Sequence, residues 1–207
     1  MRLIGITGGV GAGKSEILKF IKEHYLCRIY LADEVAHEVK KPGQPCYEKL
    51  VALMGKGILS KDGTIDRAAM ASRIFVDKSL LEKVNDIIHP AVKAYLLDKI
   101  KEAGESGQVE LFFIEAALLI ETGYKDILDE LWYIYADEEV RRKRLSISRG
   151  YAPEKITQIM EKQLSEEAFR KSCNFEIDNS TTLEHSFSQI KDRLKEYTWR
   201  ESADETV

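Results

Sequence analysis

Short apolar runs alternate with segments of helical apolar spacing along most of this 207-residue chain. Apolar runs closed by turn residues predict buried strands, whereas apolar residues that recur every three or four positions predict helices. The expected strands are 2–7, 27–32, 109–114, 131–136 and 175–177. The expected helices are 14–25, 33–39, 137–149, 153–172 and 182–198. Strands separated by helices form parallel β-α-β units, so the pattern predicts an α/β fold with a five-stranded parallel sheet between helical layers.

The stretch 46–103 breaks this alternation because it is mostly helical. It is too long for one crossover, so we expect an inserted helical lobe at 41–104 on a core made of 1–40 and 105–207. A turn-rich segment at 55–64 interrupts the helices, and His89-Pro90 is expected to end one helix and begin another, since proline disfavours helix at the preceding residue. The polar tail 201–207 is expected to be frayed.

The glycine-rich segment "GGVGAGKS" at 8–15 lies between the first strand and the first helix. It matches the pattern G-x-x-x-x-G-K-[ST], in which successive backbone N–H groups and a helix N-terminus surround a phosphate. Side chains would block that approach, hence the small residues. Lys14 is expected to reach the β- and γ-phosphates of a nucleoside triphosphate, and Ser15 to help hold Mg²⁺. The candidate nucleotide-binding residues of this loop are Gly9, Gly11, Ala12, Gly13, Lys14, Ser15 and Glu16.

Composition and charge narrow the class of partners. The net charge of −4 disfavours a general surface for nucleic acid. The three cysteines are far apart and form no CxxC pair, as is typical of reduced thiols in a cytoplasmic protein. No apolar run approaches the ~20 residues that a membrane span needs.

The glycine loop predicts triphosphate binding but does not settle the reaction. No N-K-x-D element for guanine is present, and a small chain with a separate lobe favours a kinase for a small molecule. Such a kinase needs a group near the γ-phosphate that receives or orients the proton of the acceptor hydroxyl. Asp33, directly after the second strand, is the candidate. Its position fits a helix N-cap equally well.

Two further features have both a chemical and a structural interpretation. Glu115, at the end of the third strand, is either an acid near Mg²⁺ or a strand-end cap. The arginines of the helix at 137–149 either lie on a solvated face or belong to a lid, at about 141–172, that closes over the triphosphate. These arginines are Arg141, Arg142, Arg144 and Arg149. His89 is either functional or a polar residue at a helix junction.

Beyond these residues, the sequence resembles the dephospho-coenzyme A kinase family over about residues 1–197. The resemblance depends on an ordered series of short elements. They are "TGGVGAGKS", "LADEVAHEV" with Asp33, the G-x-(I/L)-D-R element at 63–67, "IIHP" at 87–90, "ALLIETG" at 117–123, the arginine helix, Gln163, and "IDNS" at 177–180.

The resemblance implies the last step of coenzyme A biosynthesis, in which ATP phosphorylates the ribose 3′-hydroxyl of dephospho-CoA. It also implies a P-loop NTPase core, a helical CoA-binding lobe and a short lid. Asp33 matches the presumed base of the family and Arg144 its lid arginine, so the catalytic candidates are Asp33, Lys14 and Arg144. The metal candidates are Ser15 and Glu115.

The chain departs from the family pattern at several positions. Leu31 stands where the family has a first aspartate, Glu16 replaces a threonine, and Arg149 comes one place after the usual second lid arginine. The alternatives are a P-loop kinase of another nucleoside or small alcohol and a non-catalytic nucleotide-binding regulator. The expected cofactors are ATP and Mg²⁺, and the expected partner is the small molecule dephospho-CoA, with no membrane. The oligomeric state is open, with a monomer favoured.

Overall fold

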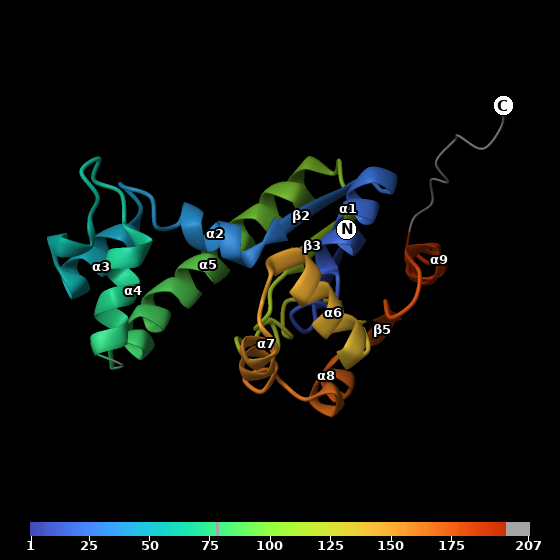
Figure 1. The fold of residues 1–207 in the computed structure, drawn as a ribbon. Helices are drawn as coiled ribbons and strands as arrows, with labels where there is room; N and C mark the ends of the chain where they lie inside the picture. Colours follow the sequence, from blue (N-terminus) through green and yellow to red (C-terminus); the bar gives the residue numbers. More distant parts are fainter. Residues whose placement is uncertain (78, 198–207) are drawn as a thin grey trace. The chain divides into compact units, whose positions relative to one another are not determined.

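The computed structural model describes residues 1–77 and 79–197, so the predicted frayed tail and residue 198 lie outside the described residues. The chain divides into two compact units (Figure 1). The first joins Met1–Ile29 with the chain from Ser106 onward, and the second is Tyr30–Glu105. Each unit is described by itself below.

A five-stranded sheet organises the first unit. Its strands are β1 (Arg2–Thr7), β2 (Cys27–Leu31), β3 (Leu111–Glu115), β4 (Glu130–Tyr135) and β5 (Phe175–Asp178). Their order across the sheet is β2-β3-β1-β4-β5. β1 is parallel to both β3 and β4, and β4 is parallel to β5. The predicted parallel five-stranded sheet is therefore confirmed, with the third strand beginning two residues and ending one residue later than expected.

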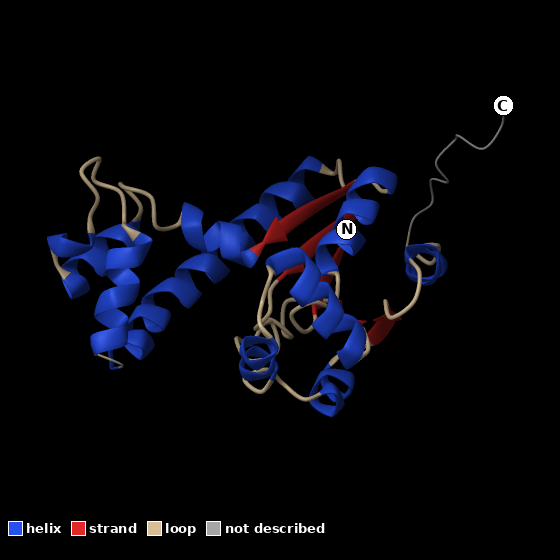
Figure 2. Ribbon diagram, viewed as in Figure 1, coloured by secondary structure: helices blue, strands red, loops and turns tan. Residues whose placement is uncertain are grey.

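The helices of the first unit come after β1, β4 and β5 in the chain. Figure 2 draws helices in blue and strands in red. They are α1 (Lys14–His24), α6 (Glu138–Arg149), α7 (Pro153–Met160), α8 (Glu166–Ser172) and α9 (Leu183–Leu194). The predicted helix 153–172 is two helices, because Ser165 begins α8 as an N-cap whose hydroxyl accepts from the Ala168 amide. Thr182 caps α9 in the same way, through the His185 amide.

Helices cover both faces of this sheet, as the ring contacts of β4 show. Successive side chains of a strand point to opposite faces. Trp132 packs edge-on against Phe175, and α9 reaches this face because Arg193 lies over the Phe175 ring. On the other face, Tyr133 stacks on Phe169 of α8 at 4.7 Å between ring centroids. The fold thus has the three layers that the strand-helix alternation predicts.

The second unit is helical from Ala32 onward in its described residues, with one isolated bridge between Leu59 and Ile65. Its elements are α2 (Ala32–Glu38), α3 (Pro45–Met54), the 3₁₀ turn η1 (Lys56–Ile58), α4 (Arg67–Val76) and α5 (Ser79–Ser106). Asp66 caps α4 by accepting from the amides of Ala68 and Ala69. The turn-rich segment 55–64 separates α3 from α4 as predicted.

The predicted helix boundary at His89-Pro90 is wrong. α5 continues through Pro90 for 28 residues. Proline removes one backbone N–H donor and therefore one intrahelical bond, to the carbonyl of residue 86. The rest of the helix outweighs that loss, since Val84, Val92, Leu96 and Ala103 are all buried along it. The helix also ends at Ser106, three residues beyond the predicted helical stretch 46–103.

A buried carboxylate ties α9 to the start of β4. Glu130 is 3% exposed and accepts hydrogen bonds from Trp132 Nε1 at 2.8 Å, from Arg193 Nη2 at 2.9 Å and from the Tyr197 hydroxyl. Arg2 Nη2 donates to it at 3.3 Å. Burial acts to raise the pKa of the Glu130 carboxyl, but the hydrogen bonds from Tyr197, Trp132 and Arg193 outweigh it and lower the pKa.

Replacing Glu130 by glutamine is expected to lower the free energy of unfolding at pH 7 by about 3 kcal/mol, because it removes the buried counter-charge of the partly exposed Arg193 and Arg2 guanidinium groups. A carboxyl whose folded pKa is lowered contributes its stability above its unfolded pKa and loses it as the pH falls through the folded pKa. The deficit of Glu130→Gln should therefore shrink below about pH 4. Urea unfolding at pH 7 and below pH 4 measures both effects, with the exposed Glu105→Gln as control. An equal deficit at both pH values would contradict this account.

Candidate active site

The loop Gly8–Gly13 joins β1 to α1 in a backbone conformation that favours glycine. Gly11 has φ 80° and Gly13 has φ 91°, both in the left-handed region. Gly13 is the N-cap of α1 and has no side chain to occupy the helix N-terminus. The loop therefore leaves the backbone at the N-terminus of α1 uncovered by side chains, as an anion-binding P-loop requires.

Protein packing also requires small residues in this loop. A Cβ at Gly8 would meet the Ile134 carbonyl oxygen at 2.5 Å, one at Gly9 would meet the guanidinium of Arg141, and one at Gly13 would meet the side-chain amide of Asn179. The sequence explains the glycines only by the approach of a phosphate. The structure adds a second cause, the close contact of the loop with β4, α6 and the segment after β5.

Two arginines of α6 hold the carbonyl oxygens of the loop. Arg141 Nε donates to Val10 O at 3.0 Å, and Arg144 Nη1 donates to Ala12 O at 3.3 Å. Arg144 Nη2 also donates to the backbone oxygen of Asn179 at 2.9 Å. Both positions lie on one face of α6, three residues apart. These contacts show that this face of α6 packs against the loop and is not entirely solvated. The closing of a lid over a triphosphate stays a prediction.

Asn179 braces the loop from the end of β5. Its side chain is buried, its Nδ2 donates to Ala12 O at 2.8 Å, and its Oδ1 accepts from the Ser186 hydroxyl at 2.9 Å. Its backbone N–H donates to Tyr135 O at 2.8 Å. Hydrogen bonds of Asn179 thus connect the P-loop to β4 and α9.

Lys14 and Glu115 form the charged pair of the site. Lys14 Nζ donates to Gly8 O at 2.8 Å and lies 3.5 Å from Glu115 Oε1. Both side chains are 16% exposed, so solvent screens the pair less than a surface ion pair. Glu115 ends β3 beside Ile6 of β1, which places its carboxylate at the P-loop edge of the sheet.

The donor set beside Lys14 is one that suits Mg²⁺. Ser15 offers an exposed hydroxyl in the first turn of α1 and Glu115 offers a carboxylate. Mg²⁺ prefers oxygen ligands and is usually held by one or two side chains together with substrate phosphates. Among the described residues, no group of three or more His, Cys, Asp or Glu side chains gathers for a metal. The available oxygens therefore fit a cation that arrives with a nucleotide.

Asp33 lies in the first turn of α2 and is exposed. The N-cap of α2 is Leu31, without a side-chain cap hydrogen bond, so Asp33 does not have the N-cap role that its sequence position allowed. Its carboxylate accepts no hydrogen bond and forms no ion pair within residues 1–77 and 79–197. It belongs to the second unit, whereas Lys14 and Glu115 belong to the first.

Two other predicted site residues, Glu16 and Arg149, are exposed on α1 and α6. Glu16 is exposed in the first turn of α1. Arg149 is the last residue of α6, also exposed, with its guanidinium 6.0 Å from the Tyr151 ring centroid. Within the part of the chain that the structure describes, no hydrogen bond joins the Arg149 or Glu16 side chain to the loop carbonyls that Arg141 and Arg144 bind. The roles of both residues stay predictions.

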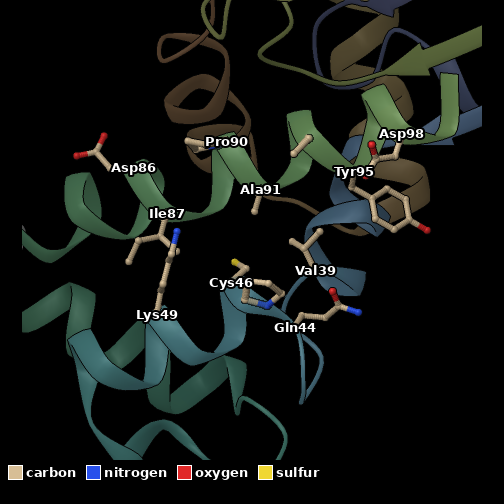
Figure 3. A pocket seen from close by; sticks show the side chains of 12 residues that line it. Val39, Gln44, Cys46, Lys49, Asp86, Ile87, Pro90, Ala91, Tyr95 and Asp98 are labelled. Carbon is tan, nitrogen blue, oxygen red and sulfur yellow. The ribbon is translucent and has the colours of Figure 1, made fainter. Parts of the chain in front are cut away.

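The second unit contains a cavity of about 420 Å³ between α5 and the segment that begins α3 (Figure 3). Figure 3 shows Cys46 and Lys49 extending from α3 toward α5, with Ala91 pointing back from α5. Its apolar lining comes from Val39, Ile87, Pro90 and Ala94, and its polar lining from Gln44, Tyr95 and Asp98 among others. Apolar walls with a few polar groups are typical of small-molecule binding sites.

A family model for dephospho-CoA kinase matches residues 2–185, which is most of the chain. The chain belongs to the dephospho-CoA kinase family. A dephospho-CoA kinase of Carboxydothermus hydrogenoformans is 33% identical over 96% of this chain and 96% of that protein. One from Aquifex aeolicus is 35% identical over 96% and 98%. A crystal structure from Thermus thermophilus superposes with a TM-score of 0.78 at 27% identity, covering 95% of this chain and 98% of that one.

Membership of the dephospho-CoA kinase family confirms the resemblance inferred from the motif series. The sequence did not assign roles to Gln163 and Asn179, although both lie in that series. The signal for Asn179 is its place directly after β5, at the same edge of the parallel sheet as the P-loop. None of the described helices combines the length and apolarity of a membrane span.

Proposed function

We propose that this protein transfers the γ-phosphoryl group of ATP to the ribose 3′-hydroxyl of dephospho-CoA, which yields CoA and ADP. The observation that carries the proposal is the braced P-loop with Lys14 at its end, on a chain that the dephospho-CoA kinase family matches over residues 2–185. Phosphoryl transfer depends mainly on positioning and charge neutralisation, and this loop supplies both.

Four residues act on the phosphate side of this reaction. The amides of the P-loop bind the triphosphate, and Lys14 neutralises charge at the β- and γ-phosphates. Arg144 uses two of its five N–H donors on Ala12 and Asn179 carbonyls, so donors remain for a phosphate oxygen. Ser15 and Glu115 would hold Mg²⁺, which when bound neutralises phosphate charge.

On the acceptor side, Asp33 orients the 3′-hydroxyl and accepts its proton. Its exposed carboxylate is not committed to capping α2, which supports this role. A carboxylate at hydrogen-bond distance from a hydroxyl removes the proton as the new P–O bond forms. The cavity of the helical unit, with apolar walls and a few polar groups, is the proposed place for the pantetheine arm of the acceptor.

The decisive experiment measures ADP release from Mg-ATP with a panel of acceptors. Dephospho-CoA should stimulate ADP release strongly, whereas AMP, shikimate and plain nucleosides should not. A phosphorus NMR spectrum of the product should place the new phosphate on the ribose 3′-oxygen. Stimulation by another alcohol alone would favour a different small-molecule kinase, and ATP binding without turnover on any acceptor would favour a non-catalytic regulator.

The proposal also includes a cytoplasmic location, and the oligomeric state stays open, with a monomer favoured. An enzyme that consumes ATP works where ATP is supplied, and the three cysteines are free thiols. Burial raises the pKa of Cys27 to about 11 and that of Cys173 to about 12, so both remain protonated and weakly nucleophilic at neutral pH.

A further inference from the structure

The side chain of Gln163 joins the P-loop to Arg141 through one oxygen atom. Gln163 lies in the turn after α7, and its Oε1 accepts from the Val10 backbone N–H at 3.2 Å. The same oxygen accepts from Arg141 Nη2 at 2.8 Å. Since both partners are N–H groups, which can only donate, the atom that they share is the carbonyl oxygen of the Gln163 side-chain amide and not its nitrogen.

These bonds close a ring around Val10. Arg141 Nε donates to the Val10 carbonyl at 3.0 Å, while the Val10 N–H reaches Gln163. The backbone on both sides of Val10 and the plane of the guanidinium are therefore held together. The Arg141 guanidinium lies so close to the P-loop backbone that a Cβ at Gly9 would overlap with it.

Arg141 and the neighbouring Arg142 differ in the charge of their hydrogen-bond partners. Arg142 donates to the Glu138 carboxylate at 2.7 Å, which offsets its charge. No carboxylate in the described ranges 1–77 and 79–197 forms an ion pair with Arg141, and its side-chain partners there are a carbonyl and a neutral amide. A neutral amide satisfies the donors of Arg141 without cancelling its positive charge.

We propose that Gln163 is a positioning residue for ATP, which holds Arg141 against the P-loop and leaves the charge of Arg141 available to the triphosphate. The inference rests on the proposed function, since it assigns a nucleoside triphosphate to this loop. Gln163 acts through Arg141 and Val10 and touches no reacting atom. A carboxylate in its place would make the same bonds but would pair with Arg141 and repel the phosphates.

Gln163→Glu is the informative variant, because it keeps the shape of the side chain and adds one charge. We expect its KM for ATP to rise about tenfold, because a carboxylate 2.8 Å from Arg141 Nη2 would interact strongly with the charge of that arginine. Its Tm should not fall, since the glutamate still accepts from Arg141. Gln163→Leu should lose the ring, with a smaller rise in the KM for ATP and a lower Tm. Gln108→Glu, the same change at an exposed loop position, is the matched control and should resemble the parent.

The measurements are KM for ATP and kcat with dephospho-CoA, direct binding of ATP by calorimetry, and Tm for each variant. A Gln163→Glu protein with normal Tm and an ATP affinity within twofold of the parent would overturn the inference. So would a Gln163→Leu protein that binds ATP more weakly than Gln163→Glu, because the bridge alone would then matter. A parent protein that binds ATP but ignores dephospho-CoA would instead contradict the proposed function, and calorimetry would still test Gln163.

Discussion

Replacing Lys14 by methionine is expected to lower kcat/KM for ATP about a thousandfold, because it removes a preorganised cation from the place where charge is redistributed during transfer. The ammonium donates to the Gly8 carbonyl at 2.8 Å and lies 3.5 Å from the Glu115 carboxylate. Because these contacts already fix the Lys14 side chain, ATP binding loses little free energy to ordering it. Methionine keeps an unbranched side chain one heavy atom shorter than that of lysine and removes the charge and its donors.

The measurement is steady-state ADP release with dephospho-CoA as acceptor, together with Tm. Lys19→Met is the matched control, since Lys19 is exposed on the same helix and should tolerate the change with normal kinetics. A Lys14→Met protein that folds normally and keeps kcat/KM within tenfold of the parent would contradict the role of Lys14. A fall in Tm alone would point instead to the lost ion pair with Glu115.

Asp33→Asn is expected to lower kcat about a hundredfold or more with little change in the affinity for ATP, because it removes the proton acceptor and keeps the shape of the side chain. Asp33 belongs to the helical unit and does not contribute to the P-loop, so triphosphate binding should not depend on it. The amide can still accept a hydrogen bond from the hydroxyl, but it is too weak a base to take the proton.

Single-turnover kinetics with saturating Mg-ATP and dephospho-CoA isolate this effect from product release. Glu34→Gln is the control, because Glu34 is the neighbouring exposed acid in the same helical turn. Since Asp33 caps no helix, its substitution should also leave Tm nearly unchanged. A kcat of Asp33→Asn close to that of the parent would show that positioning alone drives the transfer.

Long-range contacts could not be predicted from the sequence. Arg141 and Val10 are 131 residues apart, Asn179 and Ala12 are 167 residues apart, and each pair meets only because the parallel sheet brings strand ends to one edge. The sequence pattern of several arginines on one helix is the same whether their side chains face water or contact a loop. Glu130 likewise has no sequence signal, since its donors come from both ends of the chain.

The sequence by itself determined the P-loop, the strand-helix alternation and the family, because these depend on local backbone chemistry, short-range periodicity and an ordered motif series. Only the tertiary structure decided which arginines of α6 hold the loop, that Leu31 and not Asp33 caps α2, and that α5 runs through Pro90. These outcomes depend on packing between distant segments and on the balance of one lost hydrogen bond against many buried side chains. Neither quantity is encoded in the spacing of residues along the chain.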